Sequence, residues 1–83
     1  MKFQLIFSEE ALWQLKKLDN KTAKRILDKL ESTTTDPVNF FERLAGREEY
    51  KLRVGDYRIL ARILIVDKKI FVMSIGHIKK IYK

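Results

Sequence analysis

Positive charge recurs on both sides of a Gly-Asp pair in the segment YKLRVGDYRILAR, residues 50–62. Lys and Arg side chains bind phosphate oxygens, and the planar guanidinium can do so through two parallel N–H donors. These residues could therefore bind a phosphate group, provided that the fold brings them together. Gly55 and Asp56 favour the two-residue turn of a β-hairpin, because glycine readily adopts the positive φ that such turns need.

The hairpin register predicts which side chains share a face of the sheet. One face receives Tyr50, Leu52, Val54, Tyr57, Ile59, Ala61 and Ile63, and the other receives Glu49, Lys51, Arg53, Arg58, Leu60 and Arg62. In this register Arg53 lies opposite Arg58, and Glu49 lies opposite Arg62. Like charges placed opposite each other destabilise a sheet by roughly a few tenths of a kcal/mol, so their alignment indicates a bound anion. The alternative is a solvated sheet face that Glu49 and Asp56 partly neutralise.

The N-terminal half of the chain supplies the elements that must hold this hairpin. Residues 2–7 alternate as a strand, and Ser8 is placed to cap a helix that begins at Glu9. Helical spacing relates Ala11, Leu12, Leu15 and Leu18 in this first helix, and Ala23, Ile26, Leu27 and Leu30 in a second. The short join at Asp19-Asn20 makes the two helices an αα-hairpin.

The second half of the chain is predicted to form mainly strands. The segment STTTDP, residues 32–37, breaks the helical pattern, because the residue before Pro37 is pushed out of the α region. A single helical turn then follows, anchored to the core by Phe40, Phe41 and Leu44 and ended by Gly46. Strands are expected at about 48–54, 57–66 and 70–76. Residues 1–83 thus predict one α+β domain with the order β-α-α-β-β-β, an N-terminal α-hairpin packed on one face of a small, mainly antiparallel four-stranded sheet.

Strand alternation extends the two faces into the last strand. After a turn at residues 67–69, Phe71, Met73 and Ile75 are expected on the core face, and Val72, Ser74 and Gly76 on the charged face. Gly76 should lie near Leu60 and leave room for a ligand to approach the backbone. The segment from Lys68 to Lys83 contains five lysines and no acidic residue, so positive charge also gathers beside the hairpin.

Composition restricts the class of protein and its chemistry. Among 83 residues, 46% are hydrophobic and 35% charged, and Glu9 and Glu10 interrupt the N-terminal apolar run, so we expect a folded cytoplasmic protein without signal peptide or membrane span. The net charge of +7 favours a polyanionic partner such as nucleic acid. With no cysteine and one histidine, disulfides, thiol catalysis and cysteine/histidine zinc sites are excluded, and we expect no metal or cofactor.

Two motifs resemble the RelE/ParE superfamily of toxins from type II toxin–antitoxin systems. They are LAGREEYKLRVGDYRILARI and VMSIGHIKKIYK, and the resemblance covers essentially the whole chain. Membership of the RelE branch implies a metal-independent endoribonuclease that cleaves mRNA in the ribosomal A site and inhibits translation. The ribose 2′-OH would attack the adjacent phosphate, giving a 2′,3′-cyclic phosphate and a 5′-OH. The implied partners are a cognate RelB-like antitoxin and the ribosome, with no membrane.

The resemblance also implies roles for individual residues. Arg58 matches the family arginine after the DY pair and would hold the phosphate oxygens. Lys51 would stabilise the developing charge or, with Arg53 and Arg58 nearby to favour its neutral form, accept the 2′-OH proton. His77 follows Gly76 as in relatives and could serve as general acid or base, although a lone histidine in a tail is commonly a surface residue. Tyr82 would stack on or orient the nucleotide.

The remaining cations complete the expected site. Lys79 or Lys80 could replace an arginine that often follows the histidine in relatives, where this chain has Ile78. The residues expected to hold RNA are Arg53, Arg62, Lys80 and Lys83. The aromatic residues Trp13, Phe40, Phe41 and Phe71 are expected in the core or facing an antitoxin. Two alternatives stay open, a ParE-like inhibitor of DNA gyrase and a non-catalytic nucleic-acid-binding relative.

Overall fold

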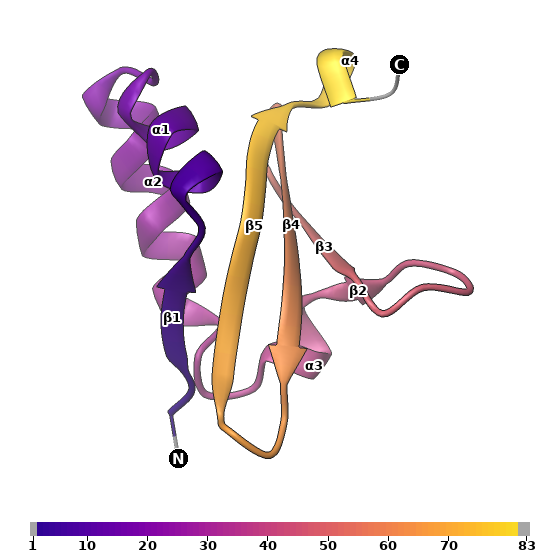
Figure 1. The fold of residues 1–83 in the computed structure, drawn as a ribbon. Helices are drawn as coiled ribbons and strands as arrows, with labels where there is room; N and C mark the ends of the chain where they lie inside the picture. The colour runs from indigo at the N-terminus through magenta and orange to yellow at the C-terminus, as the bar shows by residue number, and fades with distance from the viewer. Residues whose placement is uncertain (1, 82–83) are drawn as a thin grey trace.

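The computed structural model describes residues 2–81 and shows two long helices against one side of a sheet (Figure 1). The elements are β1 (Gln4–Phe7), α1 (Glu9–Lys16), α2 (Asn20–Ser32), α3 (Pro37–Phe40), β2 (Glu42–Arg43), β3 (Tyr50–Val54), β4 (Tyr57–Leu64), β5 (Lys69–His77) and α4 (Ile78–Ile81). The predicted α+β class and N-terminal α-hairpin are confirmed. The sheet has five strands rather than four, because the two-residue strand β2 joins its edge.

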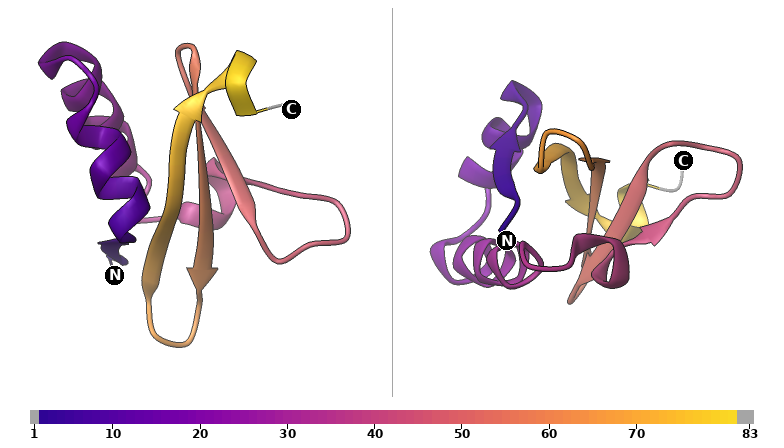
Figure 2. Two further views of the ribbon diagram at one scale, coloured as in Figure 1. Left: turned by 45° about the horizontal axis from the view of Figure 1, so that its top comes forward. Right: turned by 90° about the horizontal axis from the view of Figure 1, so that it is seen from below.

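The sheet order β1-β5-β4-β3-β2 places the predicted hairpin β3–β4 between β5 and the short edge strand. Only β1 and β5 pair in parallel among the described strands, so the sheet is mainly antiparallel, as expected. Figure 2 shows α1 and α2 on the same side of the sheet from two further directions. The other side is left open at β3 and β4, where the cations of the hairpin lie.

Helix α1 begins where the sequence places its cap. The Ser8 hydroxyl accepts a hydrogen bond from the backbone N–H of Ala11 at 3.0 Å, which satisfies one of the unpaired donors of the first turn. The same hydroxyl donates to the carbonyl of Met73 in β5 at 2.7 Å. Ser8 therefore both starts α1 and fastens it to the sheet.

The core lies between the helices and the covered face of the sheet. Its fully or nearly buried apolar residues are Ala11, Ile26, Leu30, Phe41, Leu52, Val54, Ile59, Ala61, Ile70, Val72 and Ile75. Phe3, Leu5 and Phe7 of the N-terminal segment pack against them, together with Tyr50, Tyr57 and Ile63. The core face predicted for β3 and β4 is thus confirmed. Among the helices of residues 2–81, none has the length and apolar character that a bilayer crossing requires.

The predicted alternation of β5 is wrong in its first half because the strand contains a bulge. Val72 pairs with Ala61 and Ser74 with Leu60, so Met73 has no partner of its own on β4. Val72 is consequently buried, although alternation placed it on the charged face, and Phe71 and Met73 are only half-buried. Beyond the bulge the predicted phase returns, and Ile75 is buried as expected.

Gly76 pairs with Arg58 and not, as predicted, near Leu60. The difference arises at the turn between β4 and β5, because Leu64 pairs with Lys69 and β4 ends two residues earlier than expected. Two side chains from α1 and its cap hold the irregular backbone, since Ser8 binds the Met73 carbonyl and the Gln14 side-chain oxygen accepts from the Ile75 N–H. The Met73 carbonyl and the Ile75 N–H thereby have hydrogen-bond partners.

Candidate functional site

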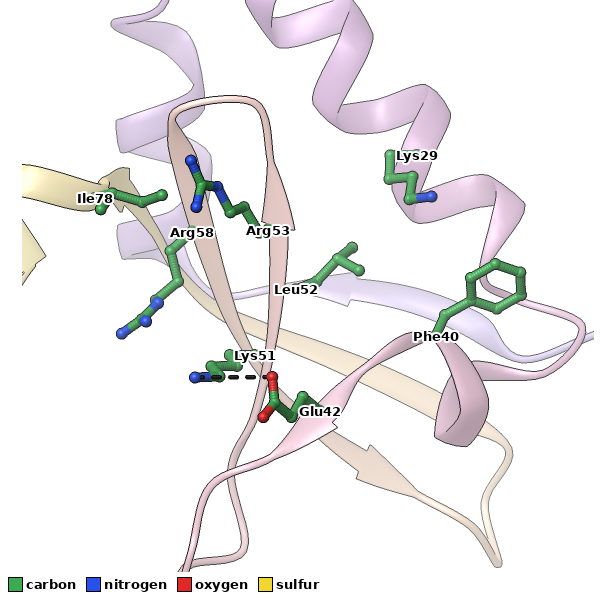
Figure 3. Close-up of a pocket in the computed structure, with 8 residues that line it drawn as sticks. All are labelled: Lys29, Phe40, Glu42, Lys51, Leu52, Arg53, Arg58 and Ile78. Atoms are coloured by element: carbon green, nitrogen blue, oxygen red, sulfur yellow. Dashed lines mark ion pairs between the residues drawn. The ribbon is translucent and has the colours of Figure 1, made fainter.

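A pocket of about 540 Å³ lies at the edge of β3, where β2 stops pairing with it (Figure 3). The ladder between the two strands ends at Glu42 and Lys51, so the following part of β3 borders open space. Four cationic side chains line the pocket, namely Lys29, Lys51, Arg53 and Arg58. One acidic side chain, Glu42, stands among them.

The hairpin turn brings three of these cations together as the sequence predicts. Gly55 has φ of +60°, and Arg53 pairs with Arg58 across the turn. Lys51 pairs with Leu60 two positions further along, on the same face of the sheet. The Arg53 side chain is held by a hydrogen bond from Nε to the Gly55 carbonyl at 2.9 Å. Arg58 and Lys51 therefore face one pocket, and the predicted clustering is confirmed.

Lys51 and Glu42 form an ion pair at 3.8 Å between Nζ and Oε1. The Lys51 side chain is 30% exposed, whereas that of Glu42 is 75% exposed. Lys51 thus contributes a positive charge to the pocket, which suits charge stabilisation. A carboxylate is itself an ordinary proton acceptor. The pair thus offers a cation and a base in one place.

Apolar side chains form the rest of the wall. Leu52 points from β3 toward α2, and Phe40 and Lys29 lie on that side of β3 in Figure 3. Ile78 lines the opposite end of the pocket, at the start of α4. Its backbone N–H donates to the Asp56 carbonyl at 2.9 Å, so the hairpin turn fixes where α4 begins.

His77 lies away from this pocket. It pairs with Tyr57, while the neighbouring Gly76 pairs with Arg58, so alternation directs His77 to the face opposite that of Arg58. The imidazole meets the Tyr57 ring edge-on at 5.4 Å between centroids, and its Nδ1 accepts from the Lys79 backbone N–H at 3.2 Å. The structure therefore does not bring His77 together with Arg58 and Lys51.

The other predicted site residues are dispersed. Arg62 forms an ion pair with Glu48 and borders a separate hollow beside Arg43, not the pocket of Arg58. Lys79 is exposed in α4. The side chain of Lys80, and Tyr82 and Lys83 as a whole, lie outside the described residues.

Glu49 pairs locally and does not join the pocket. Its pKa lies below the ordinary value of a glutamate, chiefly because its own backbone N–H donates to the carboxylate. Desolvation is the next largest effect and opposes this shift, whereas a hydrogen bond from the Arg47 guanidinium at 3.0 Å and the charges of Arg47 and Arg62 lower the pKa further. The β3–β4 ladder begins at Tyr50 and Ala61, and Arg62 takes Glu48, not Glu49, as its ion-pair partner.

The sequence did not predict Lys29, Glu42 or Phe40 as residues of the pocket. Phe40 was expected in the core or facing an antitoxin, and Glu42 lies in the segment expected to form a helical turn up to Gly46, where the structure has β2 instead. Phe40 is 46% exposed, whereas its neighbour Phe41 is buried and anchors this segment. Leu44 is half-buried. Two adjacent phenylalanines were the one available signal, because neighbouring side chains point in different directions in helices and in strands.

The sequence matches a family described as the ParE toxin of type II toxin–antitoxin systems, parDE, over residues 5–82. The chain therefore belongs to the RelE/ParE superfamily of type II toxins. A relative from Methanocaldococcus jannaschii that carries the name toxin RelE1 is 30% identical over 88 residues, covering 100% of this chain and 98% of the relative. This toxin thus resembles both branches in sequence, one through the family and the other through the relative.

Solved structures share the fold of this toxin. The RelBE2 toxin–antitoxin complex from Mycobacterium tuberculosis aligns with a TM-score of 0.83 at 19% identity, covering 93% of this chain and 99% of that chain. The intact RelBE complex from E. coli aligns with a TM-score of 0.79 at 25% identity, covering 90% and 95%. The bulged five-stranded architecture of this toxin therefore belongs to a RelE-like fold.

Proposed function

We propose that this toxin is an endoribonuclease that cleaves mRNA in the ribosomal A site and so inhibits translation. The observation that carries the proposal is the grouping of Arg58, Lys51 and Glu42 around one pocket. Arg58 supplies a permanent cation with a planar fork for phosphate oxygens, and the Lys51–Glu42 pair supplies a second cation and a base. These are groups that attack of a ribose hydroxyl on a phosphate requires.

The reaction divides between these side chains as follows. The 2′-oxygen forms a bond to phosphorus while the bond from phosphorus to the 5′-oxygen of the next nucleotide breaks, leaving a 2′,3′-cyclic phosphate. Glu42 takes the 2′-OH proton, and Arg58 with Lys51 stabilises the negative charge that builds on the non-bridging oxygens. This charge balance needs no metal ion, because Arg58 and Lys51 would place two positive charges beside the phosphate.

The leaving 5′-oxygen needs a proton, and the candidates lie in the C-terminal segment. Lys79 and Tyr82 are the proposed donors, because Lys79 directly follows Ile78 at the rim of the pocket, whereas His77 faces the other side of the sheet from Arg58. Arg53 and Lys29 are proposed to hold the RNA backbone on either side of β3, together with Lys80 and Lys83. Arg62 is proposed to contact RNA only weakly, because Glu48 already neutralises it.

The test compares Arg58→Ala with Arg62→Ala in a translation reaction. The two arginines lie four residues apart on the same strand, so one variant controls for the loss of surface charge in the other. We expect Arg58→Ala to lower the cleavage rate at least 100-fold, as removal of one oxyanion donor does, while Arg62→Ala stays within a few-fold of the wild type. Mapped mRNA ends report cleavage, and full cleavage by Arg58→Ala would refute the assignment.

An antitoxin of the RelB kind is the proposed protein partner. The solved RelE-like structures include toxin–antitoxin complexes from M. tuberculosis and E. coli. A segment that neutralises this toxin should be acidic, since it must cover a chain with a net charge of +7. Salt-dependent association with an acidic partner encoded next to the toxin would support this, and salt-independent binding would contradict it.

A second function follows the ParE branch, because residues 5–82 match the ParE family and Ile78 occupies the pocket rim. The toxin would then inhibit DNA gyrase by binding and would need no nuclease chemistry. A supercoiling assay run beside the translation reaction separates the two functions. Loss of supercoiling without mRNA cleavage would favour gyrase.

A further inference from the structure

An exposed aromatic ring borders the cationic pocket from the far side of β3. Phe40 is the last residue of α3 and is 46% exposed. The Lys29 Nζ lies 5.5 Å from the centroid of its ring, within the range of a cation–π contact. Both side chains line the same pocket as Arg58 and Lys51. A flat apolar surface with an ammonium group beside it is therefore part of the site.

The position of this ring is set by the chain that carries it. Pro37 is fully buried at the start of α3, and the Phe41 N–H donates to the Pro37 carbonyl at 2.9 Å. Because Phe41 is buried and follows directly, the chain at residue 40 is anchored while the Phe40 ring projects outward. Because the backbone at this position is already anchored, only the rotation of the Phe40 side chain is restricted when a ligand covers the ring, which limits the cost of binding.

The pocket has two walls of different chemistry. In Figure 3 Arg53, Arg58 and Lys51 lie on one side of β3, and Phe40 and Lys29 lie on the other. A nucleotide has the same division, with charge on its phosphate and an apolar face on its base. Aromatic side chains beside a cationic groove are the usual means by which proteins hold single-stranded nucleic acid.

We propose that Phe40 and Lys29 form a base-binding subsite, in which the ring stacks on the nucleobase next to the phosphate held by Arg58 and Lys51. The proposal rests on the proposed RNA-cleaving function and adds a substrate contact to it. Lys29 contributes attraction to the phosphate of that nucleotide and does not take part in the reaction. RNA is favoured over a peptide as the occupant because cations stand on both walls of the pocket.

Trp13 and Lys17 provide a matched control. Trp13 is 58% exposed on α1, and the Lys17 Nζ lies 4.0 Å from its ring centroid, so this pair repeats the chemistry of Phe40 and Lys29. It does not line the pocket. A generic effect of removing an exposed aromatic residue from a basic protein should therefore appear equally in Trp13→Ala and Phe40→Ala.

The experiment uses short single-stranded RNA with a 2′-deoxy sugar at the cleavage position, which cannot react, and 2-aminopurine as the neighbouring base. The fluorescence of 2-aminopurine is quenched when the base stacks. We expect quenching with wild-type toxin, Phe40→Trp and Trp13→Ala, and none with Phe40→Ala. Affinity should fall about tenfold in Phe40→Ala, as for the loss of one stacked base.

Two further comparisons isolate the contact. Replacing the 2-aminopurine nucleotide by an abasic one should weaken binding to the wild type about tenfold, because the Phe40 ring then has no base to stack on. The affinity of Phe40→Ala should not change, because this variant has no ring to lose the contact. Lys29→Gln should reduce the slope of log affinity against log salt by about 0.7, whereas Phe40→Ala should leave that slope unchanged.

The proposal is overturned if Phe40→Ala and Trp13→Ala bind the RNA alike, or if Phe40→Ala weakens abasic and intact RNA equally. It is also overturned if Phe40→Ala weakens only the antitoxin complex, since the ring is then a protein contact. Wild-type toxin that quenches 2-aminopurine through Phe40 but leaves mRNA uncut during translation would support the subsite and refute the nuclease function.

Discussion

Replacing Gly55 by alanine tests the turn on which the cationic pocket depends. Gly55 has φ of +60°, a conformation that costs a residue with a side chain about 1–2 kcal/mol. Alanine also restricts the unfolded chain, which returns about 0.4–1 kcal/mol. The backbone alone should therefore cost about 1 kcal/mol. For a chain of this size, that corresponds to a fall of about 4–8 °C in melting temperature.

The structure adds a second cost at this position. A Cβ atom on Gly55 would stand 2.9 Å from Nη1 and 3.2 Å from Cζ of Arg25, closer than such atoms normally approach. Arg25 is exposed and its far end can rotate away from the turn, so the extra cost is that of a disfavoured rotamer, about 0.5–1 kcal/mol. Gly55→Ala should therefore destabilise the toxin by about 1.5–2 kcal/mol in all.

Gly46 supplies the control for this reasoning. Its φ is +69°, and no atom lies within 4 Å of the place that a Cβ would occupy. Gly46→Ala should thus show the backbone cost alone. In a protein that already carries Arg25→Ala, adding Gly55→Ala should lower the free energy of unfolding by no more than Gly46→Ala does. Chemical denaturation of the four proteins, including Arg25→Ala, measures each free energy of unfolding. If Gly55→Ala costs no more than Gly46→Ala, the contact with Arg25 carries no energy and the reasoning fails.

Four further outcomes are expected. Ser8→Ala loses both the helix cap and the bond to β5 and should cost about 1–2 kcal/mol in denaturant titration, whereas Ser8→Thr should retain most of it; an unchanged midpoint would contradict the capping role. Ile59→Ala empties a fully buried site and should cost about 2–5 kcal/mol by the same measurement. The lowered pKa of Glu49 means that its contribution to stability is present above the ordinary glutamate pKa and is lost as the pH falls through the folded-state value, so Glu49→Gln should flatten the acid side of the stability–pH curve. Arg62→Ala should change the unfolding free energy by less than about 1 kcal/mol, because its pair with Glu48 is exposed, and a larger loss would show that the pair is better fixed than its exposure implies.

Local patterns in the sequence predicted much of the fold. Alternation marked β1, β3 and β4, helical spacing marked α1 and α2, and Ser8 and Gly55 marked a helix start and a turn. Each of these signals acts between residues a few positions apart, so they can be read along the chain. The facing of Arg53 and Arg58 follows from the two-residue turn alone.

Local patterns could not predict which side chains in the first half of β5 face the core. The bulge at Met73 is held by Ser8 and Gln14, which bind partners 65 and 61 positions away in the chain. No local period reports such contacts, and one added residue reverses the faces of every residue on one side of it. The same added residue decides that Gly76, and not Ile75, stands opposite Arg58.

The amino-acid sequence by itself determined the strands β1, β3, β4 and β5, the helices α1 and α2, the turn at Gly55, and the alignment of Lys51 and Arg58 on one face. Tertiary structure decided what surrounds them: Lys29 from α2, Phe40 from α3 and Glu42 from β2 complete the pocket. These three residues come from elements that no hydrophobic period links to the hairpin. Packing against a shared core brings them together. The hydrophobic pattern shows which face of each element is buried, but it does not show which buried faces meet.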